Sequence, residues 1–261
     1  MAVSKDEIVR SVKAERRATI GLLRTLEPEQ FDVPTALPGW RIREVVAHLI
    51  TVDKATVAGT NLLVVFTSME RLERWNEGQV PKWASRPVSD LLVGLERWGR
   101  RFARFVGMLP APMYRMRMPN PWGRVGGMMV WVRAYDEWVH RQDIRRALGM
   151  PDQDTDLASV SEFLLTCMAT VTLREIGPRP GRVAISIQGA PVAEWVYDLS
   201  SSTGGPLGAS DADARIVAPA EAFIMAAAGR DSFDELRANG TLTLEGDEAL
   251  ANVYLAKTRI V

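Results

Sequence analysis

MMVWVRAYDEWVHRQDIRRALG (128–149) is the stretch that decides the fold of this chain. It holds no proline, and it ends at Gly149, a residue type that commonly closes a helix. At 100° per residue, Asp136 and His140 fall within about 40° of each other and share their face with apolar residues such as Val132. A carboxylate on the inward face of a helix needs a cation, a metal or a dense set of hydrogen bonds, because burying it alone is costly. The stretch therefore predicts a core helix with a polar site on its buried face.

Apolar stripes with helical spacing also precede and follow this stretch. Prolines and glycines separate them, notably Pro28 to Gly39, Asn76 to Pro87 and the four prolines between 110 and 121, where regular helix is not expected. Four main helices with one longer connection are typical of a four-helix bundle, with the last helix as a link or buttress. The further helices are expected at about 8–26, 40–75 with a break near Gly59, 88–107 and 156–175.

The pattern changes at GPRPGR (177–182), after which short alternating segments are typical of strands. We expect strands in 183–189, 193–200, 214–218 and 241–246, helices in 219–229 and 231–240, a helix capped by Asp247, and a loop over 200–208. The predicted fold class is therefore α plus α+β. It has a bundle domain at 1–176 and a small α+β domain at 177–261.

Composition excludes several classes of protein. Of 261 residues, 32 are basic and 32 acidic, so no global positive charge favours nucleic acid or an anionic membrane. The apolar run near NLLVVF (61–66) is too short to span a bilayer, and the charged N-terminus lacks a signal core. Cys167 is the only cysteine and lies in an apolar helix, so we expect a buried, inert thiol. A cytoplasmic protein without nucleic-acid or membrane partners is expected.

His48 and His140 are the only two histidines of the chain. A single histidine on an apolar helical face is more often structural than a ligand, and this interpretation stays open for each. An Asp-x-x-x-His pair, however, can present both side chains to one ion, and His48 from a neighbouring helix would add a third ligand. Two histidines and one carboxylate leave positions open on zinc, nickel or iron(II), as reactive metal sites do. The residues thus favour a metal site of His48, Asp136 and His140.

Two neighbouring acids compete for roles near this site. Glu137 also has a usable spacing to His140, but its wheel position beside Arg141 favours a solvated salt bridge, so Asp136 is the preferred ligand. Asp143 follows His140 by one turn and either orients its imidazole or pairs with Arg145 or Arg146. The segment MYRMRMPNPW (113–122) is either an irregular surface loop or an adaptable lip over the site.

Three segments resemble a known family. PGWRIREVVAHL (38–49) resembles the Gly-Trp to Ala-His-Leu segment of DinB-like bundles. DEWVHRQDIRRALG (136–149) is similar to the matching helix of the mycothiol-dependent maleylpyruvate isomerase group. The segment 226–251, with AAAGR and NGTLTLEGDEALA, is similar to that group's second domain, which resembles sterol carrier proteins. The likeness covers nearly the whole chain, and the order of the motifs is its specific part.

The resemblance implies a DinB-like bundle, a catalytic divalent metal and the low-molecular-weight thiol mycothiol. The family's metal ligands correspond to His48, Asp136 and His140, and zinc is the metal in the isomerase. The family often has glutamate where this chain has Asp136, which is one methylene shorter, and this affects metal affinity and choice of metal. The family's functional arginine corresponds to Arg230.

Three functions are weighed on these grounds. The first is a metal-dependent transferase or isomerase in which mycothiol or another small thiol attacks an electrophilic substrate. Arg230 or an arginine of 113–124 would hold a carboxylate. The second is a non-enzymatic protein that binds a small apolar ligand, with a structural or vestigial metal. The third is a regulatory or interaction module with a vestigial site.

Overall fold

The chain forms two compact units. The computed structural model describes residues 4–60, 69–120, 123–151, 157–189, 194–206 and 212–260. One unit is helical and contains 4–120 and 125–151, and the other is mixed and consists mainly of 157–260. The predicted change from helical to mixed structure is therefore confirmed.

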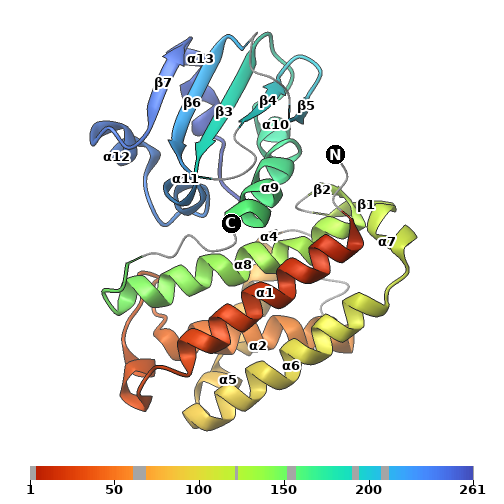
Figure 1. The fold of residues 1–261 in the computed structure, drawn as a ribbon, viewed down its shortest axis with the longest axis vertical. Helices are drawn as coiled ribbons and strands as arrows, with labels where there is room; N and C mark the ends of the chain where they lie inside the picture. The colour runs from red at the N-terminus through yellow and green to blue at the C-terminus, as the bar shows by residue number, and fades with distance from the viewer. Residues whose placement is uncertain are drawn as a thin grey trace. The chain divides into compact units, whose positions relative to one another are not determined.

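The helical unit is a four-helix bundle made by α1, α2, α6 and α8. In Figure 1, α1 lies between α6 and α8, and α2 closes the ring by packing against the same two helices. This part of the chain contains α1 (Lys5–Leu23), the 3₁₀ helix η1 (Pro28–Asp32), α2 (Ile42–Ala58), α4 (Met69–Gln79), α5 (Pro81–Ala84), α6 (Val88–Met108), α7 (Ala111–Arg115), β1 (Arg117–Asn120), β2 (Gly123–Val125) and α8 (Gly126–Ala147).

The ends of the bundle helices follow from local chemistry. The Ser4 hydroxyl accepts a hydrogen bond from the backbone N–H of Glu7, whose carboxylate accepts one from the Ser4 N–H, so α1 begins with a capping box. The predicted break in the second helix is confirmed, because Gly59 ends α2 with a φ of +70°. The NLLVVF segment lies outside the described residues.

Four sequence expectations about helices were wrong. Residues 76–78 do not form a connection, because α4 continues to Gln79. Pro81 and Pro112 each lie in the first turn of a short helix, where proline's missing N–H is not needed. The predicted helix at 156–175 is two helices, α9 (Leu157–Met168) and α10 (Val171–Ile176).

The mixed unit has a five-stranded sheet in the order β5-β4-β3-β6-β7. β3 and β6 are parallel, and the other neighbours are antiparallel. Two of the helices, α11 and α13, each contact the parallel strands β3 and β6. The strand β5 lies in the stretch that the sequence predicted as a loop. The elements after α10 are β3 (Arg182–Gln188), β4 (Glu194–Asp198), β5 (Thr203–Gly205), β6 (Ala214–Pro219), α11 (Ala220–Ala227), α12 (Phe233–Ala238), β7 (Thr243–Gly246) and α13 (Glu248–Leu255).

The boundary between the units differs from the predicted one at 176/177. The described residues from Leu157 onward belong to the mixed unit, so α9 and α10 are part of it. The physical reason is that α9 packs against α11, and the Tyr197 hydroxyl of β4 donates a 2.8 Å hydrogen bond to the Leu165 carbonyl. The predicted buttress helix is thus core structure of the second unit.

The stretch Leu157–Ile176 has the length and apolar composition of a membrane span. It does not form one straight helix here, since Ala169 and Thr170 separate α9 from α10. More than half of it is buried inside the protein, and Cys167 is fully buried, as predicted. The stretch therefore serves as core packing.

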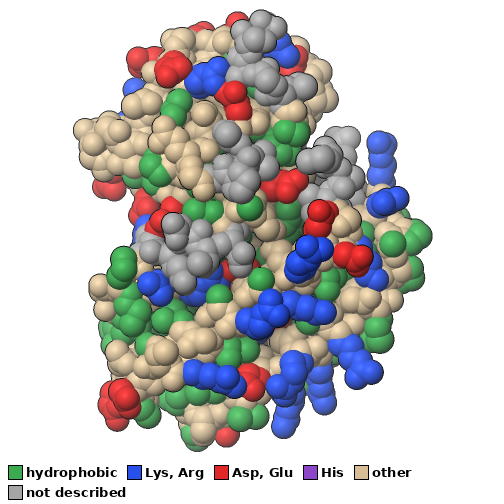
Figure 2. Space-filling view, in the orientation of Figure 1, with side chains coloured by type: hydrophobic (Ala, Val, Ile, Leu, Met, Phe, Trp, Pro, Cys, Tyr) green, Lys and Arg blue, Asp and Glu red, His purple; other side chains and the backbone are tan. Residues whose placement is uncertain are grey.

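Basic side chains gather on the outer face of α1 and α6, where Figure 2 shows them in blue. No histidine is visible on this face, in keeping with the burial of His48 and His140. Exposed cations of the two helices are Arg10, Lys13, Arg17, Arg97, Arg100, Arg101 and Arg104.

The buried ion pair of Glu15 and Arg141 gives a test of how α1 and α8 are joined. The two side chains are fully buried and lie 2.6 Å apart. Arg141→Ala leaves Glu15 without this partner, so we expect a loss of about 3–5 kcal/mol in the free energy of unfolding, measured by urea denaturation.

Arg100→Ala is the matched control. Its side chain is 76% exposed and its guanidinium lies 3.6 Å from Glu96, so we expect a change of less than about 1 kcal/mol. Equal losses in the two variants would contradict the structural importance of the buried pair.

Candidate metal centre

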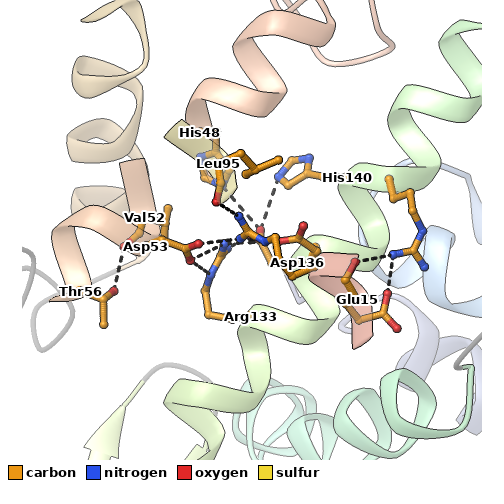
Figure 3. A network of polar contacts seen from close by, with 12 residues as sticks. Glu15, His48, Val52, Asp53, Thr56, Leu95, Arg133, Asp136 and His140 are labelled. Carbon is orange, nitrogen blue, oxygen red and sulfur yellow. Dashed lines mark hydrogen bonds and ion pairs between the residues drawn. The ribbon is translucent and has the colours of Figure 1, made fainter. Parts of the chain in front are cut away.

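Three side chains from two bundle helices converge at one point. His48 comes from α2, and Asp136 and His140 lie one turn apart on α8, as the helical wheel predicted (Figure 3). The Nε2 atoms of His48 and His140 lie 3.7 and 3.4 Å from the same oxygen, Oδ1 of Asp136. One ligand atom from each residue lies within 4.8 Å of the other two.

These spacings fit a small divalent cation. A tetrahedral ion with ligand bonds of about 2.0–2.1 Å separates its ligand atoms by about 3.3–3.4 Å, close to the two distances observed. Both histidines are buried, whereas the side chain of Asp136 is 23% exposed. The donor set of two imidazoles and one carboxylate also suits zinc and related metals, and it leaves a coordination position for another molecule.

A hydrogen bond orients the His140 ring. Nδ1 of His140 lies 2.9 Å from Oδ2 of Asp143, which is almost fully buried. This contact directs the other nitrogen, Nε2, toward Asp136. The contact that would orient the imidazole, one of the two roles considered for Asp143, is therefore present.

Trp40 forms an aromatic wall beside both imidazoles. Its ring centroid lies 5.3 Å from that of His48 and 6.2 Å from that of His140, and the two imidazole centroids are 4.9 Å apart. The Trp40 carbonyl accepts hydrogen bonds from the backbone N–H and the hydroxyl of Thr35 at 2.9 and 2.8 Å. The loop before α2 is thereby held in place, and with it the indole.

Burial and the neighbouring charges set opposite pKa shifts for the two histidines. Burial lowers the pKa of His48. Burial also opposes the charged form of His140, but Asp136 and Asp143 outweigh it and raise the pKa of His140 to about 9. For Asp136, burial is outweighed by Arg133 and then His140, so the pKa of its carboxyl lies well below the usual range. Near neutral pH, His48 is neutral, and a protonated His140 faces an ionised Asp136.

The sequence interpretation of Glu137 and Arg141 was wrong. They do not form a solvated pair, because α8 is buried on nearly all sides and both side chains lie inside. Glu137 lies 2.7 Å from Arg16 of α1, and Arg141 pairs with Glu15. Asp136 is therefore the residue that faces the histidines, as the wheel favoured.

The sequence interpretation missed a group of charged residues behind Asp136. Arg133 contacts Asp136 and lies 3.1 Å from Asp53 of α2. The spacing carries a signal, since Arg133 precedes Asp136 by three residues and Glu137 by four. No pattern in the nearby sequence, however, predicts that Arg133 pairs with Asp53 across the bundle.

Arg230, predicted from the family resemblance, lies in the mixed unit directly after Gly229, which follows α11. Its Nη1 donates a 2.6 Å hydrogen bond to the Ala228 carbonyl. Of the arginines predicted in 113–124, Arg115 and Arg117 are exposed at α7 and β1. Their predicted roles toward substrate stay predictions.

Comparison with known proteins places this geometry in context. Residues 12–145, just over half of the chain, match the family described as "Mycothiol maleylpyruvate isomerase N-terminal domain". Two similar solved structures are titled as the crystal structure of the mycothiol-dependent maleylpyruvate isomerase and as a histidine-to-alanine mutant of it. They have TM-scores of 0.61 and 0.60, 14% and 15% identity, and 93% coverage of each chain. At this identity the likeness shows the fold alone, and it confirms the predicted fold class.

No curated protein matches the chain. The resemblance of the second unit to sterol carrier proteins stays a prediction.

The raised pKa of His140 predicts a pH-dependent metal affinity. A ligand nitrogen must be deprotonated, so below a pKa of about 9 each bound ion displaces a proton from His140. Because His48 is already neutral, the apparent zinc Kd should fall about tenfold per pH unit between pH 6.5 and 8.5.

Competition with a chromophoric chelator, corrected for its own protonation, measures this slope. The control is Asp143→Asn, which weakens support for the charged imidazole and should flatten the dependence. A Kd that does not change with pH would contradict the proton competition.

Proposed function

We propose that this chain, which belongs to the mycothiol maleylpyruvate isomerase N-terminal domain family, is a metal-dependent enzyme in which a small thiol attacks an electrophilic substrate. As a transferase it would leave the thiol on the product, and as an isomerase it would release the thiol again. The observation that supports the proposal is the convergence of His48, Asp136 and His140 on one point. Family membership and the shared whole-chain fold support enzymatic activity at this coarse level.

The metal is proposed to be zinc, with nickel or iron(II) as alternatives that the same donors accept. When bound, the ion would supply the Lewis acidity that lowers the pKa of a thiol at its open position, so that a thiolate forms near neutral pH. The residues of this chain would provide the ligands, orient His140 through Asp143 and shield one side of the site with Trp40.

The thiol is proposed to come from a cofactor. Cys167 is fully buried, and burial raises the pKa of its thiol, so it is a poor nucleophile. Mycothiol is the thiol named for the structural relative, and we propose it or another low-molecular-weight thiol for this chain. The predicted cytoplasmic location suits this role, because a reducing compartment keeps small thiols reduced.

The substrate is proposed to be a small activated alkene or enone, and Arg230 to hold a carboxylate of the substrate or the thiol. A protonated guanidinium recognises a carboxylate with two parallel hydrogen bonds, which lysine cannot reproduce. We carry over the reaction class and leave the isomerase's own substrate as one member of the panel to be assayed.

His140→Ala tests the proposal directly. We expect near-stoichiometric metal in the parent protein and little in the variant, measured by mass spectrometry on tag-free protein. The rate of thiol addition should fall at least about 100-fold, because the thiolate would lose its stabilising charge. The assay follows consumption of the thiol with simple enones, and loss of maleylpyruvate in the presence of mycothiol, because an isomerisation returns the thiol unchanged.

Arg230→Lys is the companion variant. It should retain the metal and raise KM for carboxylate-bearing substrates. An active, metal-free His140→Ala protein would refute the proposal, and ligand binding that survives chelation without turnover would favour the binding-protein alternative.

A further inference from the structure

The second oxygen of Asp136 is held by a buried guanidinium. Nη1 of Arg133 contacts Oδ2 of Asp136, the oxygen that does not face the histidines (Figure 3). Nε and Nη2 of the same arginine lie 3.3 and 3.1 Å from Oδ1 of Asp53. Arg133 is 6% exposed and Asp53 is fully buried, so water screens these contacts little. The planar guanidinium thus joins α8 to α2 directly behind the candidate metal centre.

A second guanidinium completes the arrangement from α1. Nη2 of Arg16 lies 2.7 Å from Oδ2 of Asp53 and 2.7 Å from Oε2 of Glu137. Arg133 also lies 3.8 Å from Glu137. The two carboxylate oxygens of Asp53 therefore pair with different guanidiniums, and Glu137 lies close to both Arg16 and Arg133.

This network has two consequences for the candidate ligands. Because Oδ2 of Asp136 is engaged, only Oδ1 faces the imidazoles. Glu137 has a spacing to His140 that would suit a metal ligand, but its carboxylate contacts Arg16 and Arg133 instead of the imidazoles. In this group three carboxylates face two guanidiniums, and a divalent cation at the imidazole end would supply further positive charge.

We propose that Arg133 is a positioning residue that makes Asp136 a one-oxygen metal ligand and that, with Arg16 and Asp53, it keeps Glu137 out of the coordination sphere. This inference rests on the proposed metal centre and specifies its geometry. A carboxylate that binds through one oxygen occupies one coordination position instead of two. The position left over is available to the thiol or the substrate.

Arg133→Lys tests the proposal, because an ammonium keeps the charge but cannot bridge Asp53 and Asp136 in one plane. The probe is cobalt(II), which absorbs visible light strongly when four-coordinate and weakly when six-coordinate. We expect weaker absorption per bound ion in the variant, and a cobalt Kd raised about 10–100-fold. Glu137→Gln in the Arg133→Lys background should restore part of the parent spectrum, since it removes the competing ligand.

Arg141→Lys is the matched control, since Arg141 is an equally buried arginine of α8 that pairs with Glu15. It should lose stability while its cobalt spectrum and Kd stay unchanged. If Arg133→Lys does not fold, Arg16→Lys provides the same comparison through Glu137.

Parent-like spectra and Kd in folded Arg133→Lys would overturn the positioning role alone. A parent protein that binds no cobalt, zinc, nickel or iron(II) would overturn the proposed function itself. Cobalt results as expected, with no thiol chemistry on any electrophile, would support the positioning role and refute only the enzymatic function.

Discussion

The ionised carboxylate of Asp136, partly buried between two histidines and Arg133, is the constraint on which the rest of the structure depends. A charge in this position is tolerated only with compensating charge, and the protein provides it on both sides. Arg133 contacts one oxygen, and the two imidazoles face the other. Either a proton on His140 or a bound divalent cation can balance the charge of Asp136. Because the two compete for the same imidazole, metal binding depends on pH.

The helix α8, which carries Asp136, is polar and yet buried. Arg133, Glu137, Arg141 and Asp143 all lie inside the bundle, and each has a charged partner. Buried ion pairs contribute little net stability compared with apolar packing, but removing one partner is costly. The apolar core cluster, to which all four bundle helices contribute, offsets the desolvation of these charges. Part of the bundle interior is therefore polar instead of apolar. Such an interior suits a site whose ligands must hold their geometry.

The same features shape the chemistry that the site can perform. Histidine and carboxylate ligands that leave a position open favour reaction over structural closure. Trp40 covers both imidazoles, and the only thiol of the chain is buried elsewhere, so an external thiol is required for the proposed reaction. Family membership and a fold shared across 93% of the isomerase agree with this interpretation, although only 14% of residues are identical.

Periodicity within the sequence determined the four helices of the bundle, the strands β3 and β6, and the shared face of Asp136 and His140, because each depends on residues only a few positions apart. It also placed the Gly59 helix end and the Asp247 cap, which are local features. The tertiary structure alone decided that α9 belongs to the second unit, that Glu137 and Arg141 are buried, and that Arg133 meets Asp53. The helical-wheel prediction for Glu137 and Arg141 required a solvent-exposed face on α8. Whether such a face exists depends on which elements pack around the helix. Pairs such as Arg133 and Asp53 join residues 80 positions apart, and no local pattern specifies which distant charge will lie opposite when the helices pack.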